Sequence, residues 1–90
     1  MIVVDIYVTD DDIRDGDPAN CSECPIALAI SRAVPNVAVH VFDDSIIIMP
    51  FADGESNFTL TLPVNACNFI HYFDNGLPVQ PFSFQLDLDE

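Results

Sequence analysis

The sequence contains no lysine and no tryptophan, and Arg14 and Arg32 are its only residues with a permanent positive charge. Against them stand 15 Asp and Glu residues, which bring the formal net charge to −13 at pH 7. A charge of this sign repels nucleic acids and anionic membranes and attracts basic protein surfaces. We therefore expect no direct binding to nucleic acid and none to membrane.

Three explanations of the charge remain open. It can serve general solubility, it can adapt the protein to high salt, or it can imitate a polyanion toward a protein that normally binds DNA. The excess of Asp over Glu and the missing Lys also fit salt adaptation.

Long apolar runs are absent as well, and no stretch approaches the length of a membrane span. The N-terminal stretch MIVVDIYVTDDD has neither a basic region nor a small-residue cleavage site, so we expect a cytoplasmic protein. Three cysteines are an odd number, which favours reduced thiols over a disulfide framework.

Complete catalytic and ligand-binding motifs are also missing. The three glycines lie singly, which excludes a glycine-rich phosphate loop, and His40 and His71 have no triad partner at a recognisable spacing. Cys21 and Cys24 form a Cys-x-x-Cys pair, but zinc would need two further ligands, and nearby carboxylates raise thiol pKa values. We expect small packing thiols rather than a redox or metal site, no cofactor and no enzyme activity.

The length and apolar content predict one small folded domain over residues 1–90. Half of the residues are hydrophobic, which is enough to build one core and argues against disorder. Alternating patterns predict strands, and apolar residues at three- and four-residue spacing predict helices. The expected strands cover residues 2–8, 36–42, 45–51, 57–62 and 81–90. One expected helix begins at Ser22 or Cys24 and ends at Ala33, and the other covers residues 63–76.

These elements predict an α+β domain with about five mainly antiparallel strands and two helices on one face of the sheet. The strand at 45–51 is apolar on both faces and should be central. Outward polar residues on the other strands should form an open sheet face, with Asp5, Thr59, Thr61, Gln85 and Asp87 on it. In the second helix Val64, Cys67, Ile70 and Phe73 can share the inward face.

The acidic segment TDDDIRDG has a helix-start pattern. Thr9 and Asp12 have the spacing of a capping pair, and Gly16 is expected to end the turn in a left-handed conformation. Its Asp cluster fits either a helix N-terminus or a partner-binding role.

In the stretch VFDDSIIIMP, residues 41–50, a single serine separates two aspartates from three consecutive isoleucines. The flanking strands can form a hairpin whose turn contains Asp43 and Asp44, with both carboxylates exposed at the edge of the sheet. We expect Ile46 to Ile48 to enter the core. A rigid edge of carboxylates beside apolar residues suits a polyanion mimic, because the apolar contacts add affinity that salt does not screen.

Two resemblances follow from these residues. Most of the chain, through VTDDDIRDG, CSECPIALAISRA, LPVNACNFIHYFDNG and VQPFSFQLDL, resembles small proteins of bacteria and their phages, which implies a fold but no activity. Locally, DSIIIMP is similar to the acidic strand of phage uracil-DNA glycosylase inhibitors, small α/β proteins that imitate the DNA backbone.

The second resemblance implies a partner and a site. Asp44 would imitate a phosphate, Ser45 would supply the neighbouring hydroxyl, and Ile46 and Ile48 would lie on the side of an apolar pocket. In a competing alignment Glu55 and Ser56 take the place of the acidic pair, with Leu62 and Pro63 after them. The candidate partner-binding residues are Asp43, Asp44, Ser45, Ile46, Ile48, Asp53 and Glu55.

The leading hypothesis is an acidic inhibitor that occupies the DNA site of a basic DNA-binding protein, with uracil-DNA glycosylase as the most specific candidate. The alternative is a non-catalytic accessory domain, of a phage or bacterium, whose acidity serves solubility or salt tolerance.

Overall fold

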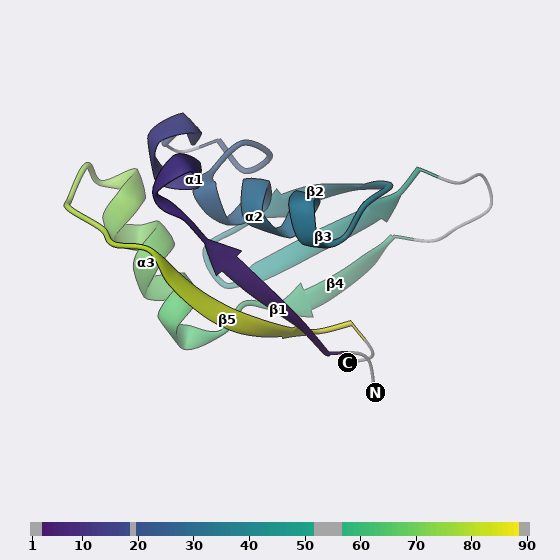
Figure 1. The fold of residues 1–90 in the computed structure, drawn as a ribbon. Coiled ribbons are helices and arrows are strands. Elements are labelled where there is room, and N and C mark those ends of the chain that lie inside the picture. The colour runs from purple at the N-terminus through teal and green to yellow at the C-terminus, as the bar shows by residue number, and fades with distance from the viewer. Residues whose placement is uncertain (1–2, 19, 52–56, 89–90) are drawn as a thin grey trace.

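A computed structural model describes residues 3–18, 20–51 and 57–88 (Figure 1). It contains five strands and three helices in the order β1, α1, α2, β2, β3, β4, α3, β5. The strands are β1 (Val3–Val8), β2 (Val37–Val41), β3 (Ser45–Pro50), β4 (Phe58–Thr61) and β5 (Phe82–Asp87). The helices are α1 (Asp10–Asp15), α2 (Pro25–Ala33) and α3 (Val64–Asp74).

The strands form two antiparallel sheets. One sheet pairs β1 with β5, the first and last strands of the chain, and the other has the order β2-β3-β4. The predicted α+β class with five antiparallel strands is confirmed, and β3 is the central strand of its sheet as expected. The division into two sheets does not follow from the strand patterns, because alternation identifies a buried face but not the partner of each strand.

The core lies between the inward faces of the two sheets and the helices. In the three-stranded sheet Val41 lies opposite Ile46 and Ile46 opposite Leu60, so these three side chains share one face. In the two-stranded sheet Ile6 lies opposite Phe84. All five are buried, and the residues on the same faces of β1 and β5, namely Val4, Val8, Phe82 and Leu86, are buried or half-buried.

Helix α2 contacts both sheets, through β1 and β2 (Figure 1). It begins at Pro25, where proline costs no hydrogen bond, and the Cys24 sulfur accepts a bond from the Ala27 amide at 3.4 Å. Ile26 and Ile30 are fully buried, one turn apart on its core face. The helix thus begins one residue after the later of the two predicted starts, and the predicted end at Ala33 is confirmed.

Helix α3 packs on β5, which crosses in front of it in Figure 1, and its core face differs from the prediction. Ala66, Phe69 and Ile70 are buried, whereas Val64 is 76% exposed, so the prediction for Val64 was wrong. The physical reason is that Phe69 packs on Phe82 of β5, with ring centroids 4.8 Å apart, so Ala66, Phe69 and Ile70 form the inward face. Val64 lies two residues from Ala66 and therefore on the opposite side of the helix.

The acidic segment forms the short helix α1 with the predicted capping box. Asp12 accepts a hydrogen bond from the Thr9 amide at 2.9 Å, and the Thr9 hydroxyl oxygen accepts one from the Asp12 amide at 3.3 Å. The prediction for Gly16 was wrong, because its φ of −74° is not left-handed. The position is tight instead: an added Cβ would lie 2.6 Å from the side chain of Pro25, where α2 begins.

Asp12 also joins α1 to α2 and β1. It is 4% exposed, and its two carboxylate oxygens each accept a 2.8 Å bond from Arg32 of α2. One of the donating nitrogens of Arg32 also bonds the Tyr7 carbonyl of β1 at 2.8 Å. The hydrogen bond from Arg32 lowers the pKa of Asp12, and the bonds from Thr9 add to this, although burial opposes it.

We predict that Asp12→Asn lowers the free energy of unfolding at pH 7 by about 2–3 kcal/mol, because it removes the charge from a buried, bidentate pair whose arginine is half exposed. The folded-state pKa is below the unfolded value, so this contribution is present above about pH 4 and is lost as the pH falls through the folded pKa. Urea titrations of both proteins from pH 7 to pH 2.5 should show the difference shrinking at the acid end.

The matched control is Asp11→Asn, on the same helix. Its ion pair with Arg14 is exposed on both sides, so stability should change little. An equal loss in the two variants would contradict the role of Asp12.

We also predict that Gly16→Ala destabilises the fold by about 1–3 kcal/mol, because the new methyl group would clash with the ring and backbone nitrogen of Pro25. Gly76→Ala is the contrast. Gly76 has a φ of +75° with open space around it, so its cost should be about 1 kcal/mol of backbone strain. Thermal unfolding of the two variants measures both, and a neutral Gly16→Ala would contradict the tight packing of Pro25.

Candidate functional site

The β2–β3 hairpin carries the candidate site at its turn. Asp43 and Asp44 connect the two strands, as the sequence predicts, and both are exposed. The Phe42 amide donates to the Ser45 carbonyl at 2.8 Å and closes the turn. The Leu62 amide donates to the Asp44 carbonyl at 3.0 Å and ties the turn to the chain just after β4. The backbone that carries the two carboxylates is therefore held on two sides.

A hollow of about 320 Å³ lies beside this turn. Segments far apart in the sequence line it, namely the loop before α2, the end of β2, the turn and α3. The lining residues are Asn20, Cys21, Cys24, Val41, Phe42, Asp43, Ile70 and Asp74. Its wall is therefore mixed: apolar side chains such as Val41, Phe42 and Ile70 stand beside polar groups that include one carboxylate from the turn and one from the end of α3.

Two of the three cysteines, Cys24 at this hollow and Cys67 of α3, have raised thiol pKa values. Burial raises the pKa of the Cys24 thiol, and the charge of Asp74 raises it further, although backbone hydrogen bonds oppose the shift. Burial also raises the pKa of Cys67, to which Asp44 and Asp43 add. All three cysteines are free thiols. The carboxylates of the site thus favour the protonated, less nucleophilic form of Cys24 and Cys67.

The described residues hold no group of three or more His, Cys, Asp and Glu side chains placed to bind a metal ion. Asp43 and Asp74 line the same hollow as the Cys-x-x-Cys pair, but among the residues whose placement is described these side chains do not converge into a metal site. Cys24 has a local structural use instead, since its sulfur caps α2.

The candidate residues differ in how far a partner can reach them. Asp43 and Asp44 are exposed and Ser45 is half-buried. Ile46 and Ile48 are 0% exposed and belong to the core, so a partner cannot touch their side chains in this conformation. Asp53 and Glu55 lie outside the described residues.

Phe42, Ile70 and Asp74 are the site residues that sequence reasoning missed. Phe42 is 42% exposed next to the turn, and its ring packs edge-on near His40. The alternating pattern of β2 does not predict this exposure, because it shows only that Phe42 and Val41 lie on opposite faces of the strand. Ile70 and Asp74 are 26 or more residues from the turn in sequence, and only the packing of α3 brings them to it.

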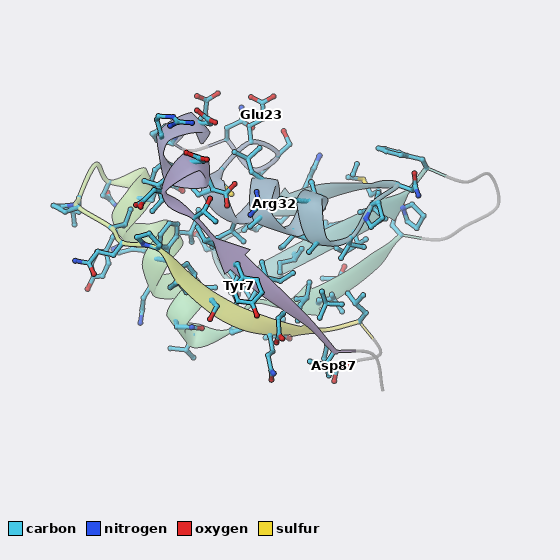
Figure 2. The ribbon with its side chains drawn as sticks, in the orientation of Figure 1. Tyr7, Glu23, Arg32 and Asp87 are labelled. Carbon is cyan, nitrogen blue, oxygen red and sulfur yellow. The ribbon has the colours of Figure 1, made fainter. Side chains whose placement is uncertain are left out.

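Other carboxylates extend the acidic surface. Asp10, Asp11 and Asp15 project from α1, and the Asp17 amide bonds the Glu23 carbonyl at 2.9 Å, which closes the loop after it. Figure 2 shows Glu23 reaching outward from the same end of the molecule as α1.

The predicted polar sheet face is divided between the two sheets. Asp5 and Gln85 lie opposite each other on β1 and β5, where Gln85 donates to Asp5 at 3.2 Å. Thr59 and Thr61 are exposed on β4, in the other sheet. Asp87 near the end of β5 is half-buried (Figure 2).

Comparison of the chain with protein-family models, with curated proteins and with solved structures yields no match. None of the helices in the described part of the chain has the length and apolar character needed to cross a bilayer. The functional argument therefore starts from the hairpin and the hollow.

We predict that iodoacetamide alkylates Cys21 faster than Cys24 in the folded protein at pH 7. Cys24 is 2% exposed and its pKa is raised, whereas Cys21 is half-buried at the rim of the same hollow. Mass spectrometry of the modified peptides measures both rates. In urea the two rates should converge, and equal rates in the folded protein would contradict the inert role of Cys24.

Proposed function

We propose that this protein is a small acidic interaction protein that occupies the nucleic-acid site of a basic DNA-binding protein and inhibits it. The observation that carries the proposal is the turn of the β2–β3 hairpin. There two adjacent, exposed carboxylates stand on a backbone held by hydrogen bonds, beside a hollow whose wall includes Phe42, Val41 and Ile70.

The physical case rests on pre-organisation. Carboxylates on a held turn lose less conformational freedom on binding than carboxylates on a mobile tail, so more of their attraction to Arg and Lys is retained. Charge also steers the encounter with a basic groove, since a net charge of −13 raises the association rate at low salt.

Apolar contacts supply the part of the affinity that salt does not screen. The exposed ring of Phe42 is next to the carboxylates in the sequence and lines the hollow beside them. Val41 and Ile70 add apolar surface to the same hollow. The resemblance to glycosylase inhibitors assigns these apolar contacts to Ile46 and Ile48, but both side chains lie in the core. Phe42 and the hollow would make the contacts instead.

Uracil-DNA glycosylase is the most specific candidate partner. This choice rests on the similarity of residues 44–50 to the acidic strand of the phage inhibitors of that enzyme. A cytoplasmic location, where DNA-processing enzymes of bacteria act, belongs to the same proposal.

The second candidate function is an accessory domain whose acidity serves solubility or salt tolerance. The observation in its favour is that carboxylates also lie far from the hairpin, such as Asp5 and Asp87 of the two-stranded sheet. Thermal unfolding in molar salt distinguishes the two functions. Strong stabilisation by salt supports adaptation, and a salt-sensitive complex with a basic protein supports mimicry.

We predict that excess protein inhibits excision of uracil from an oligonucleotide by uracil-DNA glycosylase, and that inhibition weakens as salt rises. The double variant Asp43→Asn/Asp44→Asn should weaken inhibition by about tenfold or more, because both charges that face the partner are removed. The control Asp5→Asn/Asp87→Asn removes the same formal charge from the other sheet and should change inhibition much less.

Unhindered excision at saturating protein excludes this enzyme as the partner. A pull-down from bacterial lysate then tests the wider class: basic DNA-binding proteins that elute with salt support mimicry, and their absence contradicts it. Equal effects of the two double variants would show that total charge, and not the hairpin, determines binding.

A further inference from the structure

The hollow beside the β2–β3 turn is apolar at its floor and acidic at its rim. Among its lining residues Val41 and Ile70 are each 4% exposed, so they form the floor. Asp43, Asp74 and the ring of Phe42 also line it, and all three are exposed to solvent. A ligand that matches this lining therefore has an apolar part and a positively charged end.

The two carboxylates reach the hollow from different elements. Asp43 belongs to the hairpin turn, and Asp74 is the last residue of α3, one helical turn after Ile70. The chain has no lysine, and neither of its arginines lines the hollow. No side chain with a permanent positive charge therefore lies among the lining residues.

The thiols nearby respond to the field of these carboxylates. Burial raises the pKa of Cys24 in the hollow, and the charge of Asp74 raises it further. Burial likewise raises the pKa of Cys67, to which Asp44 and then Asp43 add. A negative field that disfavours a thiolate favours a cation at the same place.

Hydrogen bonds hold the walls of the hollow in place. The Val41 amide donates to the Cys21 carbonyl at 2.8 Å and ties the loop before α2 to β2. Within that loop, Oδ1 of Asn20 accepts bonds from the amide and the hydroxyl of Ser22, both at 3.1 Å. The turn is held on two sides as well, so a ligand would find the walls already formed and would order few residues on binding.

We propose that this hollow binds an arginine side chain of the basic partner. The inference rests on the proposed function for the partner, but the binding of one side chain can be tested without it. The aliphatic stem of the arginine would lie on Val41 and Ile70, because long cationic side chains cover apolar surface while their charged ends reach polar groups. The guanidinium would then reach the carboxylates at the rim.

The lining favours arginine over lysine and leucine. A guanidinium is planar, so it stacks on an aromatic ring such as Phe42 and binds a carboxylate through two parallel N–H groups. The ammonium group of lysine is more strongly hydrated and lacks this planar fork. A leucine side chain would cover the floor, but it would displace water from the carboxylates without bonding them.

NMR titration of the isotopically labelled full chain tests the inference at constant ionic strength. The probes are short peptides with blocked ends that carry one arginine, lysine, citrulline or leucine. Citrulline has the shape of arginine without its charge. We expect the arginine peptide to give saturable shifts at the amides of Cys21, Phe42, Asp43 and Asp74. The lysine peptide should bind about threefold to tenfold more weakly, and the two neutral peptides more weakly still.

Variants separate the contributions of charge and of the ring. Asp74→Asn should weaken binding of the arginine peptide by about threefold to fivefold, because it removes one carboxylate with little change of shape. Asp5→Asn removes the same charge from the other sheet and should have little effect. Phe42→Leu retains an apolar side chain without the ring, so it should reduce the preference for arginine over lysine. The spectrum of each variant shows whether it is folded.

A second hollow at α3 serves as an internal reference. It measures about 500 Å³ and has Asn65, Asn68 and Tyr72 in its lining, with no charged side chain. The arginine peptide should leave the amides of these residues nearly unshifted.

The inference is overturned if leucine binds as tightly as arginine, if no saturable shift occurs at the hollow, or if shifts spread evenly over the acidic surface. Binding of the arginine peptide at the hollow, together with a pull-down that yields no basic protein, would contradict the inhibitor proposal alone. Inhibition of the glycosylase that Asp74→Asn leaves unchanged, together with peptide shifts elsewhere, would contradict the arginine inference alone.

Discussion

The buried pair between Asp12 and Arg32 is the contact that joins the N-terminal half of this fold. Arg32 is one of two arginines in a chain with 15 acidic residues, and it is bound to the one carboxylate that lies in the protein interior among the described residues. The pair connects α1 to α2, and the same arginine connects α2 to β1. Without it the carboxylate of Asp12 would be left buried with only the bonds from Thr9.

This contact also influences where the remaining acidic groups lie. Because α1 is held on α2 through its third residue, the other carboxylates of the helix remain in solvent. Helix α2 in turn contacts β1 and β2, one strand from each sheet, and the Val41 amide of β2 bonds the Cys21 carbonyl before α2 at 2.8 Å. The loop, the end of β2 and the hairpin turn therefore meet at the hollow as parts of one packed unit.

Helix α3 has a different role, because it separates two surfaces of different chemistry. On one side it contributes Ile70 and Asp74 to the acidic hairpin site, and on the other it borders an uncharged hollow with Asn68 and Tyr72.

The elements with strong local signals were predicted correctly from sequence. Alternation located the strands, the Thr9 and Asp12 spacing located a capping box, and Pro25 and Gly76 marked a helix start and a helix end. Gly16 was misjudged because its requirement for glycine comes from Pro25, nine residues away, and not from its own backbone angles. Val64 was misjudged because several apolar residues of α3 compete for the inward face and Phe69 takes it.

The candidate site was predicted only in part. Asp43 and Asp44 could be placed at a turn because two β patterns flank them, and the burial of Ile46 and Ile48 follows from the central position of β3. The hollow could not be predicted, since its walls come from segments that alternation and helical spacing leave unconnected.

The amino-acid sequence alone was enough to predict the charge, the five strands, the two longer helices and the turn at Asp43 and Asp44, because these depend on composition and on neighbours within a few residues. The tertiary structure decided the pairing of β1 with β5, the partner of Asp12 and the side of α3 that faces solvent. Each of these depends on which side chains pack together across long sequence separations, where many pairings satisfy the same local pattern and the geometry of the shared core selects one.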